Sequence, residues 1–235
     1  MERAILAGLL NAAFVELDAP LEATAISGFE SAEEQRAFIQ RGHSSSEIEL
    51  RASPGLVTAH LWRKGVLLGM YRAQAIDQWN QLARVLILWC INEVEVTKLA
   101  TDFPDVEAAD FAEIYEQGPA PYANYMWEKI TQRLEAHRPE MLPIVKLARA
   151  RPELSRLFPY LSHFDLRFSH FTGFPHSKGY PWIMYLGPNK YAVQGWDGQP
   201  LGEGSPEQVV AIAVMNLPPN TQPAMHGAER QQGGA

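Results

Sequence analysis

Apolar and polar residues alternate in three short runs in the first half of the chain, at residues 47–51, 56–62 and 66–71. A period of two is typical of strands that bury one side of a sheet. Turn-forming residues separate the runs, with Ser-Pro-Gly at 53–55 and Arg-Lys-Gly at 63–65. The pattern predicts a three-stranded antiparallel meander.

A second region of alternation begins at residue 163. Its first run predicts a strand with Phe164, Leu166, Phe168 and His170 on one face and His163, Asp165, Arg167 and Ser169 on the other. Residues 181–186 and 191–194 predict two more strands. Trp-Asp-Gly at 196–198 then predicts a turn into a short return strand at about 199–201.

Apolar residues recur at three- and four-residue spacing elsewhere in the chain, which is typical of amphipathic helices. The strongest such pattern covers residues 73–91 and includes Trp79 and Trp89, which we expect in the core. Further helices are expected at the N-terminus and at about 122–137, 140–150 and 207–216.

Two helix starts are indicated by a capping box, in which a Ser caps the helix and a Glu or Gln follows three residues later. Ser31 and Glu34 predict a helix that ends near Arg41. Ser205 and Gln208 predict the start of the 207–216 helix.

The order of these elements predicts an α+β fold, with two antiparallel β-meander-plus-helix units joined by a helical middle segment. The first domain is expected at 1–118, including an acidic helical segment at 93–116, and the second at 119–219. The Gly-, Gln- and Pro-containing tail, 220–235, is expected to be disordered. One continuous domain remains an alternative to two.

The charge of the chain differs between its two halves. The formal net charge is −7, yet residues 1–118 carry 9 Lys and Arg against 18 Asp and Glu, whereas residues 119–235 carry 11 against 9. Proteins that bind nucleic acid usually present a basic patch, so the composition argues against such a partner. Two solvated surfaces explain the difference, and docking of a partner or of a second subunit in a homodimer is the alternative.

The single cysteine, Cys90, allows neither an internal disulfide nor a cysteine-based zinc site, and we expect it to be a buried apolar residue.

The N-terminal apolar run is short, is interrupted by Asn11 and follows Glu2, so a first helix is expected rather than a signal peptide. No window approaches the about 20 apolar residues of a membrane span. We expect no membrane association and a cytoplasmic location.

Several spaced segments of the second half resemble a known family. They include Leu-Phe-Pro-Tyr-Leu-Ser-His at 157–163, Leu-Arg-Phe-Ser at 166–169, Thr-Gly-Phe-Pro at 172–175 and Asn-Leu-Pro-Pro at 216–219. Over roughly residues 48–227 the chain resembles an uncharacterised, mainly actinobacterial family labelled as natural-product biosynthesis proteins. The resemblance implies a place in a biosynthetic pathway, with a precursor peptide or a pathway enzyme as partner, and it brings no established catalytic residues.

Three histidines and a carboxylate gather in the second β region, at His163, His170, His176 and Asp165. A zinc or iron site needs three or four ligands converging at about 2 Å. His163 and Asp165 share a strand face, but His170 has the opposite parity. We therefore expect neither a metal site nor a cofactor.

The row His163, Asp165 and Arg167 is the best candidate for acid–base chemistry, because a carboxylate beside a histidine raises its pKa and fixes its tautomer. A solvent-facing polar row on a half-buried sheet is the alternative explanation.

A peptide-binding surface needs no catalytic motif, because an exposed sheet edge can accept an extended peptide as an added strand. The loop 175–181 would flank such an edge. The candidate binding residues are His170, Phe171, Phe174, His176, Lys178, Tyr180 and Trp182.

These observations favour a non-catalytic accessory protein that binds a peptide or protein partner in a natural-product biosynthetic pathway. A pathway that makes ribosomal peptides is one candidate. A small modifying enzyme that uses the His163 row in a cleft is the first alternative. An immunity-like module that docks its partner through the acidic segment 93–116 is the second.

Overall fold

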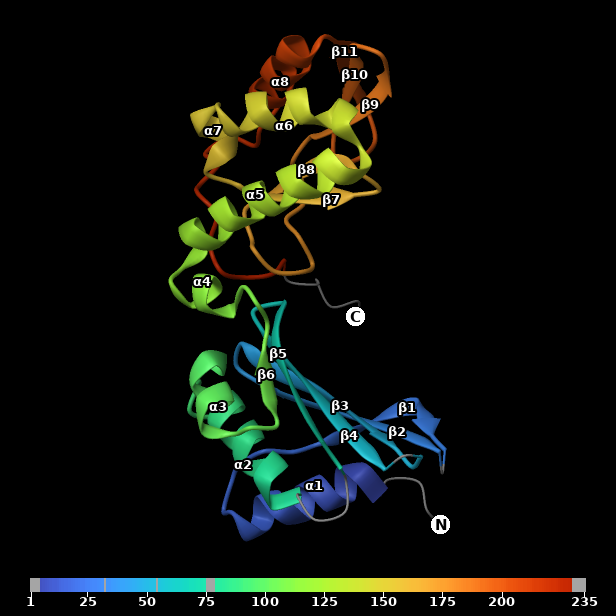
Figure 1. The fold of residues 1–235 in the computed structure, drawn as a ribbon, viewed down its shortest axis with the longest axis vertical. Coiled ribbons are helices and arrows are strands. Elements are labelled where there is room, and N and C mark those ends of the chain that lie inside the picture. The colour runs from blue at the N-terminus through green and yellow to red at the C-terminus, as the bar shows by residue number, and fades with distance from the viewer. Residues whose placement is uncertain (1–4, 32, 54, 75–78, 230–235) are drawn as a thin grey trace. The chain divides into compact units, whose positions relative to one another are not determined.

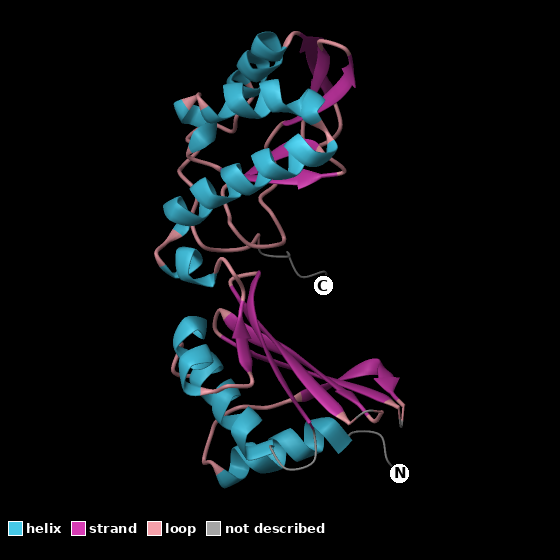
Figure 2. Cartoon of the chain, in the orientation of Figure 1, coloured by secondary structure: helices cyan, strands magenta, loops and turns pink. Residues whose placement is uncertain are grey.

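The computed structural model describes residues 5–31, 33–53, 55–74 and 79–229. The contacts of the chain divide it into two compact units, Met1–Glu116 and Gln117–Ala235, and Figure 2 shows that each combines helices with a sheet. Both sheets are antiparallel. The α+β class predicted from the sequence is therefore confirmed, and the unit boundary lies two residues before the predicted one.

The first unit is built on a six-stranded sheet whose strands follow one another in chain order. Its strands are β1 (Thr24–Glu30), β2 (Glu34–Arg41), β3 (Ser44–Arg51), β4 (Leu56–Arg63), β5 (Val66–Gln74) and β6 (Val106–Ala108). The three predicted strands correspond to β3, β4 and β5 and pair as a meander, as expected.

The helix predicted at residues 31–41 is wrong, because residues 34–41 form strand β2. Ser31 Oγ does accept a hydrogen bond from the Glu34 backbone N–H at 2.9 Å, but the bond closes the turn between β1 and β2. In β2 the buried residues alternate with exposed ones: Ala37 and Ile39 are buried, whereas Phe38 is 38% exposed. Pairing with β3 along the whole strand decides the conformation over the local capping signal.

The helices of the first unit are α1 (Ile5–Glu16), α2 (Trp79–Cys90), α3 (Val96–Asp102) and α4 (Ala112–Glu116). In Figure 1, α1 and α2 lie along one face of the sheet, where α1 contacts β2 and α2 contacts β3. The helix predicted at 73–91 is confirmed over 79–90; residues 73 and 74 belong to β5, and 75–78 lie outside the described residues. Trp89 is fully buried, as its helical position predicts.

The second unit holds a five-stranded sheet in the order β11-β10-β9-β8-β7. The strands are β7 (Phe158–Ser162), β8 (Asp165–Ser169), β9 (Trp182–Gly187), β10 (Lys190–Gln194) and β11 (Pro200–Gly204). Both edge strands contain a proline, Pro159 in β7 and Pro200 in β11.

The single strand predicted from residue 163 is a hairpin in the structure. β7 and β8 pair in register, and His163 and Phe164 form the two-residue turn between them, both with positive φ values of 53° and 69°. His163 therefore does not continue the strand face of Asp165 and Arg167, which corrects the predicted polar row.

The helices of the second unit are α5 (Pro119–His137), the 3-10 turn η1 (Pro139–Met141), α6 (Leu142–Arg149), α7 (Pro152–Ser155) and α8 (Pro206–Met215). The predicted helices α5, α6 and α8 are confirmed, and α8 begins with the predicted capping box of Ser205 and Gln208. Figure 1 shows these helices on one side of the sheet. They enclose a core that includes Trp127, Leu134, Ile144, Leu166, Phe168, Ile183, Val193 and Val210.

The last described segment, 220–229, is not the disordered tail that its composition predicts. Ala224 is 7% exposed and its N–H donates to the Arg156 carbonyl at 2.8 Å. Residues 230–235 of the predicted tail lie outside the described residues. Over the described ranges, no helix combines the length and the apolar character needed to cross a membrane.

Candidate binding pocket

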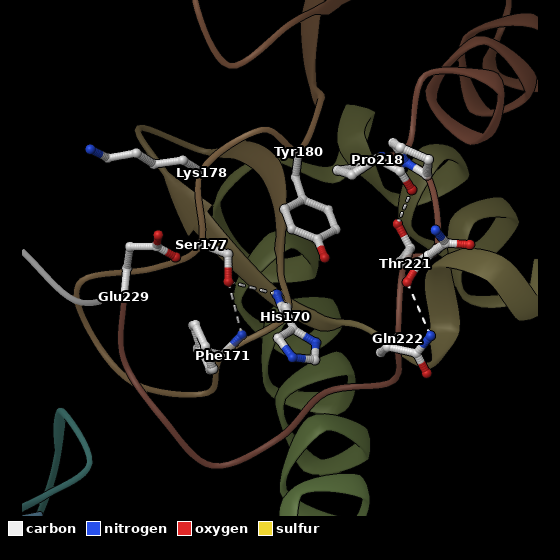
Figure 3. Close-up of a pocket in the computed structure, with 11 residues that line it drawn as sticks. His170, Phe171, Ser177, Lys178, Tyr180, Pro218, Thr221, Gln222 and Glu229 are labelled. Atoms are coloured by element: carbon white, nitrogen blue, oxygen red, sulfur yellow. Dashed lines mark hydrogen bonds between the residues drawn. The ribbon is translucent and has the colours of Figure 1, made fainter. Parts of the chain in front are cut away.

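A pocket of about 250 Å3 opens in the second unit between two segments that lack regular structure. One wall comes from the segment that follows β8 and the other from the segment that follows α8 (Figure 3). The lining residues are His170, Phe171, Ser177, Lys178, Tyr180, Pro218, Pro219, Asn220, Thr221, Gln222 and Glu229.

Two buried serines shape the first wall. Ser177 Oγ accepts hydrogen bonds from the backbone N–H groups of His170 (3.1 Å) and Phe171 (3.2 Å), and Ser169 Oγ accepts from Phe171 (2.9 Å) and Ser177 (3.1 Å). Ser169 Oγ also donates to the Phe171 carbonyl at 2.7 Å. Both hydroxyls thus satisfy backbone groups of a tight loop, so they hold the wall in shape rather than offering a nucleophile.

The second wall is fastened to the helical layer by Arg156. Its Nη2 donates to the Thr221 carbonyl at 2.7 Å, and its own carbonyl accepts from Ala224. Thr221 Oγ1 donates to the Pro218 carbonyl at 2.5 Å. These bonds keep residues 218–222 at the pocket without a helix or strand.

The interior of the pocket presents both ring and polar groups. Figure 3 shows the Tyr180 hydroxyl pointing between the His170 ring and Thr221. Tyr180 is only 8% exposed; burial raises the pKa of its phenol, and a hydrogen bond with Thr221 acts in the opposite direction. The phenol therefore stays protonated at neutral pH and can donate a hydrogen bond.

His170 carries a buried polar atom that its surroundings do not satisfy. Within the described part of the chain, its Nδ1 is buried and has no hydrogen-bond partner. Leaving such an atom unpaired costs about 1–3 kcal/mol, so a ligand group that bonds to it would recover part of that cost.

The charged residues of the pocket lie at its rim. Lys178 is exposed, and its side chain extends away from the pocket in Figure 3. Glu229 comes from the C-terminal segment and lines the same side. The interior is thus bordered mainly by rings and uncharged polar groups.

Four of the seven predicted binding residues line this pocket: His170, Phe171, Lys178 and Tyr180. The other three lie elsewhere. Phe174 is 71% exposed, the His176 ring stacks on Tyr160 with centroids 3.9 Å apart, and Trp182 packs under a guanidinium.

The predicted acid–base residues are not gathered in the pocket. His163 is exposed in the hairpin turn, and Arg167 lies with its Cζ 3.2 Å from the centroid of the Trp182 ring. Burial raises the pKa of Asp165, and the charges of Arg167 and His163 oppose that shift. These contacts place His163 in a hairpin turn and Asp165 and Arg167 on β8, not together in a cleft with a reacting centre.

The structure offers no grouping of metal ligands in the residues it describes: no three His, Cys, Asp or Glu side chains lie close enough together to hold an ion. His176 lies among aromatic rings instead. It stacks on Tyr160 and meets Phe174 edge-on at 6.0 Å.

Sequence reasoning missed the second wall of the pocket. Thr221, Gln222 and Glu229 belong to the segment expected to be disordered, because Pro, Gln and Gly residues carry no periodic signal. The run Asn-Leu-Pro-Pro at 216–219 was the nearest available signal, since it marks where α8 ends and a fixed turn begins.

Comparison with known protein families gives one match, which lies within the second unit. Residues 122–228 match a family model described as a family of unknown function (DUF6193). This range covers α5 from residue 122 onward, the five-stranded sheet and all of the pocket except Glu229. No curated protein matches the chain, and no solved structure does.

Proposed function

We propose that the second unit binds an extended peptide segment of a partner, and that this binding is what the protein contributes. The observation that carries the proposal is the unpaired, buried Nδ1 of His170 beside the Tyr180 hydroxyl inside a pocket bordered by Phe171 and Pro218. Apolar rings next to a few fixed polar groups are typical of binding sites.

The size of the pocket supports a peptide over a larger free ligand. Small-molecule sites usually enclose about 300–1,000 Å3, whereas this pocket holds about 250 Å3 and is open. One anchoring side chain fits such a volume while the rest of the segment lies outside. Anchors of this kind supply most of the binding energy at peptide and protein interfaces.

The enzyme alternative has weaker support, because the described residues contain no catalytic arrangement at the pocket. The pocket serines are bound to backbone groups, and the residues His163, Asp165 and Arg167 lie outside the pocket. Docking through the acidic segment 93–116 stays a prediction, since no contact of that segment bears on it.

The pathway in which the protein acts rests on the sequence resemblance alone. That resemblance supports a precursor peptide or a neighbouring pathway enzyme as the source of the segment. The match to a family of unknown function is compatible with this context and adds no partner of its own.

Selection from a phage library of random linear peptides, with the full-length chain as bait, tests the proposal. We expect enriched peptides that bind the wild-type chain in calorimetry. Tyr180→Phe removes only the hydroxyl and should weaken them by about threefold to tenfold, the worth of one hydrogen bond of about 0.5–1.5 kcal/mol. His170→Ala should weaken them at least as much.

Tyr185→Phe is the matched control, because Tyr185 belongs to β9, packs on Tyr191 and does not line the pocket. The selected peptides should bind the Tyr185→Phe chain with the same affinity as the wild-type chain. A selection without enrichment would refute the proposal, as would peptides that bind both pocket variants with unchanged affinity.

A further inference from the structure

The C-terminal segment Met225–Glu229 runs beside residues 170–175 in the same direction. Phe171 and Met225 form a parallel bridge. Four backbone bonds join the two segments: Met225 N–H to the His170 carbonyl (2.9 Å), Thr172 N–H to the Met225 carbonyl (3.1 Å), Gly173 N–H to the Gly227 carbonyl (2.8 Å) and Glu229 N–H to the Pro175 carbonyl (2.7 Å). Residues 170–175, in the loop after β8, therefore form a hydrogen-bonding edge that binds a parallel segment through its backbone.

Side-chain recognition along this edge is concentrated at two positions. At Gly227, an added Cβ would lie 2.6 Å from Cδ1 and 2.9 Å from Cε1 of the Phe171 ring, closer than real contacts allow. At His226, Nδ1 lies 3.0 Å from Thr172 Oγ1, within hydrogen-bonding distance. The side chain of Met225 is 46% exposed, so we do not expect residues 170–175 to select for a particular side chain at this position.

The attachment of the C-terminal chain changes at Ala224. Up to that residue the chain is held by Arg156, through the carbonyl of Thr221 and the N–H of Ala224. Beyond it, the four backbone hydrogen bonds described above join residues 225–229 to residues 170–175. Separation of residues 225–229 would leave the wall 218–222 in place and remove Glu229 from the pocket lining.

We propose that Met225–Glu229 is an exchangeable internal ligand of this edge. In its place the edge takes an extended peptide of the partner, in parallel orientation, with glycine at the register of Gly227 and a hydrogen-bonding side chain at that of His226. This inference rests on the proposed function, because the partner segment that replaces the internal one continues into the pocket beside His170. Strand addition of this kind draws its affinity from backbone bonds and its selectivity from side-chain positions.

The internal ligand lowers the apparent affinity for any external one. A tethered segment acts at an effective concentration in the millimolar range for a short linker, and the apparent affinity falls with the fraction of open chains. A substitution that weakens only the internal segment should therefore tighten external binding.

Gly227→Val in the full-length chain makes that substitution, since its side chain meets the Phe171 ring. The probe is a fluorescein-labelled peptide with the sequence of residues 222–230, and binding is measured by fluorescence anisotropy. We expect the Gly227→Val chain to bind this peptide at least about tenfold more tightly than the wild type. The same peptide carrying Val at the glycine position should bind neither chain.

Met225→Val is the control chain, because Met225 is exposed and its bonds are made by the backbone. It should bind the peptide as weakly as the wild type. If none of the three chains binds the peptide, or if all bind it equally, the segment is a fixed structural element and the inference is overturned. Peptides selected from the random library report separately on the His170 pocket, so the two failures are distinguishable.

Hydrogen exchange of the wild-type chain provides a second readout if Gly227→Val fails to fold. Segments that open locally exchange faster than the core. We expect the amides of Thr172, Gly173 and Met225 to exchange at least about tenfold faster than that of Val193 in β10. Exchange of these amides at the rate of Val193 would overturn the inference.

Discussion

The guanidinium of Arg63 lies 3.8 Å from the centroid of the Trp89 ring and also donates a hydrogen bond to the backbone carbonyl of Trp89, with 3.2 Å between Nη2 and O. The same nitrogen donates to the Val94 carbonyl at 3.1 Å. Arg63 ends β4 and Trp89 lies in the last turn of α2, so one side chain ties the sheet to the helix and to the chain that leaves it.

Replacing this arginine by lysine should cost stability. Burial lowers the pKa of Arg63, with the charge of Glu93 opposing the shift, so the side chain is held in a partly dry site. Lysine cannot reproduce the planar stacking and the forked bonds. We expect Arg63→Lys to lower the free energy of unfolding by about 1–3 kcal/mol, measured by chemical denaturation. Arg51→Lys, at a side chain 60% exposed and paired with Glu49, should change it by less than about 0.5 kcal/mol; equal losses would contradict the assignment.

Two glycines should respond in opposite directions to alanine. At Gly69 in β5, a Cβ would lie 2.6 Å from Val96 Cγ2 and 2.8 Å from the Glu107 backbone oxygen. Gly69→Ala should therefore destabilise the protein by about 1–3 kcal/mol through overpacking. At Gly8 in α1, nothing lies within 4 Å, so Gly8→Ala should stabilise it by about 0.5–1 kcal/mol. Thermal denaturation of both variants measures the contrast, and a stable Gly69→Ala would show that β6 packs less closely on β5.

Cys90 should be unreactive in the folded protein. It is 3% exposed, and burial raises the pKa of its thiol to about 12, against a smaller opposing effect of Arg63. The thiolate is the reactive form, so a colorimetric thiol reagent should detect no cysteine at neutral pH until denaturant unfolds the first unit. Rapid labelling of the native chain would contradict this burial.

Stability should fall in mild acid because of His176. Burial lowers the pKa of its imidazole below the usual 6.5, while the carbonyls of Phe171 and Gly173 act the other way. The unfolded chain takes up the proton first, so the stability that the neutral ring contributes is complete above pH 6.5 and is lost as the pH falls below it.

His176→Phe isolates this effect, because phenylalanine can keep the stacking on Tyr160 but cannot titrate. Between about pH 7.5 and about pH 5.5 the melting temperature of the wild type should drop more than that of the variant. Parallel curves for the two proteins would show that His176 is protonated equally in both states.

The strands and helices with a clear period could be predicted because their burial follows the sequence directly. Ile48, Leu61 and Leu68 are buried on alternate positions of β3, β4 and β5, and α2 buries Leu82, Leu86 and Trp89 at helical spacing. The capping box of Ser205 and Gln208 could also be predicted from the sequence, because both partners lie within four residues of each other.

The predictions failed where the conformation depends on backbone hydrogen bonds that the local side-chain pattern does not indicate. The hairpin at His163 and Phe164 uses a turn with two positive φ values and neither Asn nor Gly, so the usual signal was missing. The second wall of the pocket depends on bonds between residues far apart in the sequence, such as Arg156 with Thr221, which are 65 positions apart. Bonds to backbone groups of this kind leave no mark on the side-chain pattern.

The prolines in both edge strands of the five-stranded sheet bear on how copies of this protein behave in a crowded solution. An edge strand offers unpaired N–H and C=O groups on which another chain can build, but a proline removes one of the donors. Pro159 and Pro200 each interrupt such a row. Open-ended stacking of copies through this sheet is therefore disfavoured at either end.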